Sequence, residues 1–176
     1  MKKGIFLGII GSLLVLSLLG CDSKKSGGGE TTTVNENNQV NDKNEEKNPD
    51  VQVVADTILN DGEFADKLAP VDINLALTRL YGLDLNVVES CAFYTNSNAT
   101  AEEIAVIKVK DSADVDTVRA AYETRVEEQK AACKDYLPDE MPKLDNAIIY
   151  SSGNYVVLCV SVDNNKIEDS LTNLFE

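Results

Sequence analysis

The chain has 176 residues, enough for one domain with flanking segments. It carries 16 Lys and Arg against 30 Asp and Glu, a net charge of −14. A chain this acidic repels phosphate backbones, so we do not expect it to bind nucleic acid. It has no His, which removes the commonest general base and the commonest transition-metal ligand, and we expect no metal and no cofactor.

The N-terminus has the features of a secretory signal. Two lysines follow the first residue, an apolar run covers residues 5–19, and the small residue Gly20 precedes Cys21. The alternative is an uncleaved transmembrane helix, for which about 17 apolar residues is the short limit. No positive cluster follows the run directly, since Asp22 comes first, and this favours the cleaved signal.

The sequence Leu18-Leu19-Gly20-Cys21 resembles a lipobox, the acylation and cleavage motif of bacterial lipoproteins. In those proteins the cysteine sulfur takes a diacylglycerol, and a peptidase then cuts directly before the cysteine. The resemblance implies a signal peptide over residues 1–20, cleavage between Gly20 and Cys21, and fatty acids such as palmitate on Cys21. The expected location is the extracytoplasmic face of the cell membrane, with membrane lipid as the anchoring partner.

Residues 21–50 are expected to be the lipidated cysteine and a disordered tether. From Asp22 to Asp50 the chain has no aromatic residue and two Val. Such a stretch cannot bury enough apolar surface to offset the entropy lost on ordering.

Residues 51–176 are expected to form a single α+β domain. Neighbouring strands are joined by turns, so we predict one four-stranded, mainly antiparallel sheet packed with helices, in the order α-α-β-β-α-β-β-α. The predicted helices cover residues 51–59, 72–81, 111–134 and 163–175, and the predicted strands cover 85–95, 103–110, 147–151 and 155–162.

The last two strands are predicted to form a hairpin around Gly153-Asn154. A two-residue turn there pairs Ser151 with Val156, and Ile149 with Leu158. The opposite face, with Ile148, Tyr150, Val157 and Cys159, is apolar too, which is unusual for a half-exposed antiparallel sheet. Either the helices within residues 51–81 cover it, or it is a partner or dimer surface.

The cysteines and several acidic residues can each be interpreted as structural or as functional residues. Beyond Cys21, the three remaining cysteines are expected to be buried small hydrophobes, or to include a Cys91–Cys159 disulfide. Asp111 and its acidic neighbours are expected to cap a helix rather than bind calcium. Glu102 and Glu103 are adjacent, so they point to opposite sides of a strand and cannot flank one substrate bond; we expect a solvated strand start.

Three segments carry a resemblance to a known family: Ala101-Glu102-Glu103-Ile104-Ala105, Tyr136-Leu137-Pro138-Asp139, and Ser152-Gly153-Asn154-Tyr155-Val156. Together they resemble a family of small extracytoplasmic lipoproteins from Gram-positive anaerobes, defined only as a domain of unknown function. The resemblance spans residues 101–162, with a weaker similarity at 81–83. It implies architecture and location but no activity.

These observations favour a non-catalytic binding domain whose partner is a protein or another envelope component. The alternative is an envelope enzyme, or an enzyme accessory, that uses carboxylates alone. A two-lobed solute receptor is disfavoured because the domain is small. The oligomeric state stays open. The candidate interaction surface comprises Tyr136, Asn154, Tyr155, Ile148, Tyr150 and Val157.

Overall fold

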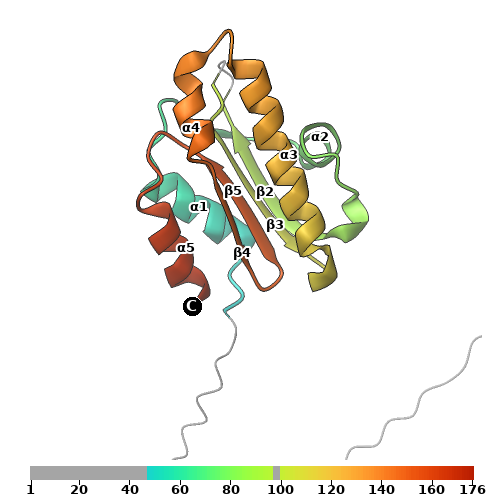
Figure 1. Ribbon diagram of the computed structural model, residues 1–176. Helices are drawn as coiled ribbons and strands as arrows, with labels where there is room; N and C mark the ends of the chain where they lie inside the picture. The colour runs from blue at the N-terminus through green and yellow to red at the C-terminus, as the bar shows by residue number, and fades with distance from the viewer. Residues whose placement is uncertain (1–46, 97–99) are drawn as a thin grey trace, which may run out of the picture. The chain divides into compact units, whose positions relative to one another are not determined.

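A computed structural model describes residues 47–96 and 100–176 (Figure 1). The expected signal peptide, Cys21 and the tether up to residue 46 lie outside these residues. Among the described residues, no helix is both long and apolar enough to cross a bilayer. The last four residues of the expected tether are described, and they contact the domain: Lys47 Nζ donates to Asn173 O at 3.0 Å.

The domain is α+β, as predicted, with a five-stranded antiparallel sheet in the order β1-β2-β3-β5-β4. The strands are β1 Ala69–Pro70, β2 Val88–Thr95, β3 Glu103–Val109, β4 Ile148–Ser152 and β5 Tyr155–Val160. The α-helices are α1 Val51–Asp61, α2 Ile73–Leu75, α3 Val115–Cys133, α4 Met141–Asp145 and α5 Ile167–Phe175. Single turns of 3-10 helix cover Leu85–Val87, Ser112–Asp114 and Pro138–Glu140.

The prediction of four strands and eight elements was therefore wrong in detail. β1 was missed because two residues, one of them Pro70, show no alternating pattern. α4, with five residues, is likewise too short for helical periodicity to appear. The predicted capping role of Asp111 is confirmed, because its side chain accepts a hydrogen bond from Ala113 N at 3.0 Å.

The predicted helix at 72–81 begins as α2 and continues as a π-helix, η1 (Ala76–Leu80). The wider turn is closed by Tyr81 N, which donates to Ala76 O at 3.2 Å. Gly82 then adopts a φ of 62°, a left-handed conformation that other residues rarely take, and the helix ends before it.

The predicted hairpin register is confirmed. Ser151 pairs with Val156 and Ile149 pairs with Leu158, on either side of a two-residue turn at Gly153-Asn154. Gly153 has a φ of 51°, as the turn requires. Both faces of the hairpin are apolar, and both are covered.

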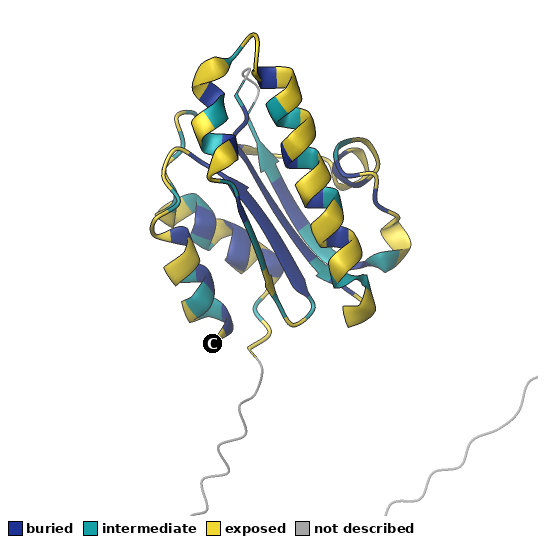
Figure 2. Ribbon diagram, in the orientation of Figure 1, coloured by how far each residue is buried: buried dark blue, intermediate teal, exposed yellow. Residues whose placement is uncertain are grey.

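The two faces of the sheet support two separate cores (Figures 1 and 2). α3 and η1 pack on one face, while α1 and α5 pack on the other. The expectation that the whole segment 51–81 covers the second face was wrong, because η1 lies on the same face as α3. The C-terminal helix α5 takes its place, with Ile167, Leu171 and Phe175 buried.

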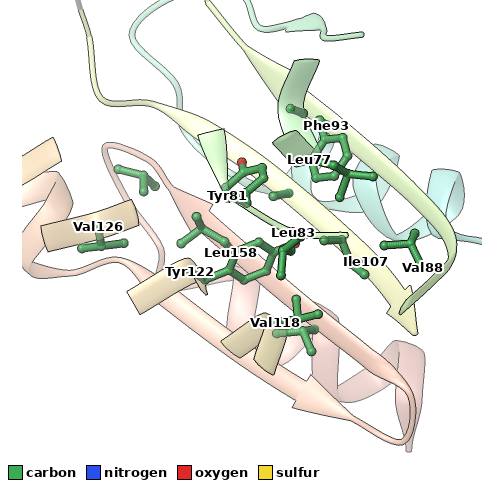
Figure 3. Packing of buried hydrophobic residues seen from close by; sticks show 14 of the residues in the cluster. Leu77, Tyr81, Leu83, Val88, Phe93, Ile107, Val118, Tyr122, Val126 and Leu158 are labelled. Carbon is green, nitrogen blue, oxygen red and sulfur yellow. The ribbon is translucent and has the colours of Figure 1, made fainter. Parts of the chain in front are cut away.

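Aromatic rings occupy the centre of the core under α3 (Figure 3). Tyr81 stacks on Phe93 with ring centroids 5.4 Å apart and meets Tyr122 edge-on at 5.1 Å. The Tyr122 hydroxyl is buried without a hydrogen-bond partner in the described part of the chain. Burial, with smaller contributions from Cys91 and Glu103, raises its pKa well above the usual value, so the phenol stays neutral.

All three cysteines of the domain are free thiols. Cys91 contacts the core under α3, whereas Cys159 lies in the core under α1 and α5, so the disulfide alternative was wrong. Burial raises the pKa of Cys91 to about 11 and that of Cys159 to about 12, and both thiols are therefore protonated at neutral pH.

The covered second face makes Tyr150→Glu destabilising. Tyr150 is half-buried and stacks on Phe175 with centroids 5.8 Å apart, so a carboxylate there loses the ring contact and meets apolar neighbours. We expect the free energy of unfolding to fall by about 1–3 kcal/mol in urea denaturation. Ser151→Glu, on the same strand but exposed, is the matched control and should change it by less than about 0.5 kcal/mol. Equal effects would contradict the coverage of this face.

Candidate functional site

Two adjacent carboxylates are buried where β3 begins. Glu102 and Glu103 are each 1% exposed, so the expectation of a solvated strand start was wrong. They do point to opposite sides, as the alternation of a strand requires. Each is satisfied by a different set of partners, and these partners explain how charges are accommodated inside the domain.

Glu103 faces α3 and is held by Arg125. The Arg125 Nη2 donates to Glu103 Oε2 at 2.8 Å, and Nε lies 3.2 Å from the same oxygen. Gln129 Nε2 and the Tyr81 hydroxyl donate to the carboxylate at 3.1 and 3.3 Å. Burial alone would lower the pKa of Arg125, but hydrogen bonding and attraction to Glu103 raise it overall, so Arg125 remains a cation.

Glu102 faces the other way and is held by Lys143. Lys143 Nζ donates to Glu102 Oε1 and to Glu140 Oε1, both at 3.0 Å. The backbone N–H of Ala65 also donates to Glu102, at 2.8 Å. Burial opposes the charge on Lys143, yet hydrogen bonds to Glu140 and Glu102 raise its pKa overall.

Glu140 connects two segments that are far apart in the sequence. Its Oε2 accepts a hydrogen bond from Ala101 N at 2.8 Å, and its other oxygen binds Lys143. The segment beginning at Ala101 and the segment around Tyr136 are thus joined by buried charges at one end of the sheet. Both are segments that carry the family resemblance.

Tyr136 projects from this end. Its side chain is 87% exposed, although the loop around it is ordered by local bonds. The backbone N–H groups of Tyr136 and Leu137 donate to Cys133 O at 3.2 and 2.8 Å. Pro138 then opens the turn that carries Glu140 into the ion-pair network. An exposed aromatic side chain is therefore presented on a fixed backbone. We call the loop 134–140 with its supporting ion pairs the Tyr136 end.

The other residues of the candidate interaction surface lie elsewhere. Asn154 lies in the β4–β5 turn and Tyr155 is the first residue of β5. This turn is at the opposite end of the sheet from the loop between α3 and α4, which carries Tyr136 (Figure 1). The Tyr155 ring is 4% exposed and packs on Phe175 with centroids 5.0 Å apart. Its hydroxyl donates toward Asn48 Oδ1 at 2.5 Å and lies 2.7 Å from Pro49 O.

Three members of that candidate surface are core residues. Ile148 is 8% exposed and Val157 is fully buried, because α1 and α5 cover the hairpin, and Tyr155 is buried beside them. Tyr150 is half-buried in the same core. The six residues therefore do not form one surface, and Tyr136 and Asn154 are the members that reach solvent away from this core.

The sequence reasoning missed Arg125, Gln129 and Lys143. Arg125 and Gln129 follow Val118 and Tyr122 at helical spacing, so they continue the buried stripe of α3. A charged side chain on such a stripe is a signal that a buried partner is needed. Within the described residues, no three His, Cys, Asp or Glu side chains are grouped so as to hold a metal ion.

Comparison with known proteins identifies the family to which the chain belongs. No curated protein and no solved structure matches the chain. A family model does match, from residue 61 at the end of α1 to residue 161 just after β5, more than half of the chain. It includes the sheet, α3 and the buried ion pairs, and it omits the two helices that cover the second face. The chain belongs to the family of the domain of unknown function DUF4358.

Proposed function

We propose that the chain is a lipoprotein of a Gram-positive bacterium, anchored by acylated Cys21 on the extracytoplasmic face of the cell membrane. Its domain binds a protein or another envelope component without catalysing a reaction. The lipobox-like Leu18-Leu19-Gly20-Cys21 after an apolar run supports the anchor. Two acyl chains give stable attachment, because each buried methylene contributes about 0.8 kcal/mol.

The observation that carries the binding role is the Tyr136 end. An aromatic side chain that is 87% exposed contributes little to the fold, yet its loop is fixed by buried ion pairs. Tyrosine is enriched in protein interfaces, and a fixed backbone reduces the entropy lost on binding. The described part of the tether joins the domain beside Tyr155, and the β4–β5 turn there lies at the end of the sheet opposite the loop between α3 and α4.

The alternative of an enzyme using carboxylates alone loses its best candidates. A substrate must reach the acid and the base, but Glu102 and Glu103 are buried and held by Lys143 and Arg125. They also lie on opposite sides of one strand, so they do not meet in a common cleft. We therefore favour binding over catalysis.

Site-specific photocrosslinking in intact cells tests the binding role. A benzophenone amino acid in place of Tyr136 should give a discrete crosslinked species. The same residue in place of Val53, which is 50% exposed on α1, is the matched control and should give none. Crosslinking of equal yield and pattern from both positions, or from neither, would remove the Tyr136 end as the binding surface.

A further inference from the structure

A polar cleft lies at the end of the sheet opposite Tyr136. The tether residues Lys47 and Asn48 form one wall, the turn Ser152–Asn154 forms another, and Lys108, Glu89 and Tyr155 complete it. Its volume is about 320 Å³, at the small end of the range for ligand sites. A second hollow of about 350 Å³ adjoins it, shares Asn48, Glu89, Lys108 and Tyr155, and continues along Pro49–Val51.

Lys108 occupies an unusual position in the sheet. It lies on the central strand β3, where the other six residues are buried and all but the ion-paired Glu103 are apolar. Its strand neighbours Ile104 and Val106 belong to the core under α1 and α5, whereas Lys108 ends this row with an ammonium group. An otherwise apolar row thus ends in a charged group that lines the cleft.

The ammonium group of Lys108 is held by two contacts, which leave part of its hydrogen-bonding capacity unused. Lys108 Nζ donates to Glu89 Oε1 at 2.7 Å and lies 5.7 Å from the centroid of the Tyr155 ring. The hydrogen bond to Glu89 raises its pKa, so it remains a cation. An ammonium has three N–H groups, and these contacts engage two directions. One N–H remains for a ligand.

Acceptors and donors without partners surround this cation. The second carboxylate oxygen of Glu89 is outside the ion pair, and its side chain is 47% exposed. The Ser152 hydroxyl makes no hydrogen bond within the described residues. The cleft therefore offers a carboxylate oxygen, an ammonium N–H and a hydroxyl within one small volume.

The charge balance selects the class of ligand. Lys47 also lines the cleft, but its Nζ donates to Asn173 O at 3.0 Å, so Lys108 and Glu89 are the charges left to meet a ligand. A simple anion would be attracted by Lys108 but repelled by Glu89, and a simple cation would be attracted by Glu89 but repelled by Lys108. A compact molecule with both charges satisfies both residues. The geometry points to a binding site for a small zwitterion of the α-amino acid type, its ammonium on Glu89 and its carboxylate on Lys108 and Ser152. This site is separate from the Tyr136 end and does not depend on the lipid anchor.

Titration calorimetry of the full chain in detergent tests the proposal, with the common free amino acids as the probes. At least one should bind saturably at up to about 10 mM, since two hydrogen-bonded charge contacts are sufficient for weak binding. The N-acetyl derivative and the amide of that amino acid each lack one charge. Each should bind at least about tenfold more weakly than the parent.

Variants locate the binding. Glu89→Gln and Lys108→Met should each weaken it by about tenfold or more, while Glu123→Gln on α3 should leave it unchanged. Circular dichroism checks that the variants fold. The comparison of the amino acid with its N-acetyl and amide derivatives uses the unmodified chain and so does not depend on any variant. The proposal is overturned if no amino acid binds, if the derivatives bind as well as the parent, or if binding persists in folded Glu89→Gln and Lys108→Met.

Discussion

Arg125→Met is expected to lower the free energy of unfolding by about 3–5 kcal/mol, the effect of removing one partner of a buried ion pair. Arg125 supplies the cation that neutralises Glu103, whose side chain is 1% exposed. Methionine keeps much of the packing of the arginine stem but leaves the carboxylate without a counter-charge. Gln129 and Tyr81 still donate to Glu103, although neither neutralises it. Urea denaturation at pH 7 measures the loss.

Arg119→Met provides the matched control on the same helix. Arg119 pairs with Glu123 at 3.2 Å, and the two side chains are 44% and 55% exposed. Such surface pairs contribute about 0–1 kcal/mol, so this variant should be nearly as stable as the parent chain. The double variant Arg125→Met with Glu103→Leu should regain part of the loss, because no charge is then left buried. Equal stability of Arg125→Met and Arg119→Met would show that the buried carboxylate of Glu103 does not depend on Arg125 to neutralise it.

This buried pair also shows where sequence reasoning reached its limit. The alternation of β3 correctly placed Glu102 and Glu103 on opposite sides, because side-chain direction follows from local geometry. Their burial depends on cations 22 and 41 positions away, Arg125 and Lys143, and no local pattern links them. The default expectation that carboxylates face water fails here because each one gains a tertiary partner.

The β4–β5 hairpin was predictable because its pairing is determined by residues close together in the sequence, unlike the pairing of the buried ion pairs. A Gly-Asn turn between two apolar runs specifies pairing over a few residues, and the register of Ser151 with Val156 followed directly. That both faces are apolar left two alternatives for the second face, cover by helices or a partner surface, and the structure shows cover by helices. Which helix covers the second face depended on chain topology, so α5 was not identified and η1 was placed on the wrong side.

The buried stripe of α3 shows that part of the site was within reach. Val118, Tyr122, Arg125 and Gln129 recur at three- and four-residue intervals, so they share one face of the helix. Reading Arg125 as part of the buried face would have called for an acidic partner in the core. The exposure of Tyr136, in contrast, depends on how the loop 134–140 is held by Glu140, which only the tertiary structure reveals.

Cys21→Ser is expected to abolish lipidation completely. Only a cysteine offers the thiol that becomes the thioether to the diacylglycerol, and a serine hydroxyl does not replace it. Because cleavage in lipoproteins follows acylation, the variant should also keep residues 1–20 and migrate as the longer precursor. Growth with a radioactive or alkyne-bearing palmitate, followed by gel analysis, measures both outcomes in the same sample.

Cys91→Ser is the matched control, since it replaces a half-buried free thiol within the domain by the same residue. It should retain full label and the mature size, because Cys91 lies on β2, far along the chain from the lipobox-like motif. Label that survives in Cys21→Ser, or that disappears in Cys91→Ser, would place the acyl chain elsewhere and contradict the proposed anchor. Loss of label in Cys21→Ser alone would assign the lipid to one atom, Sγ of Cys21.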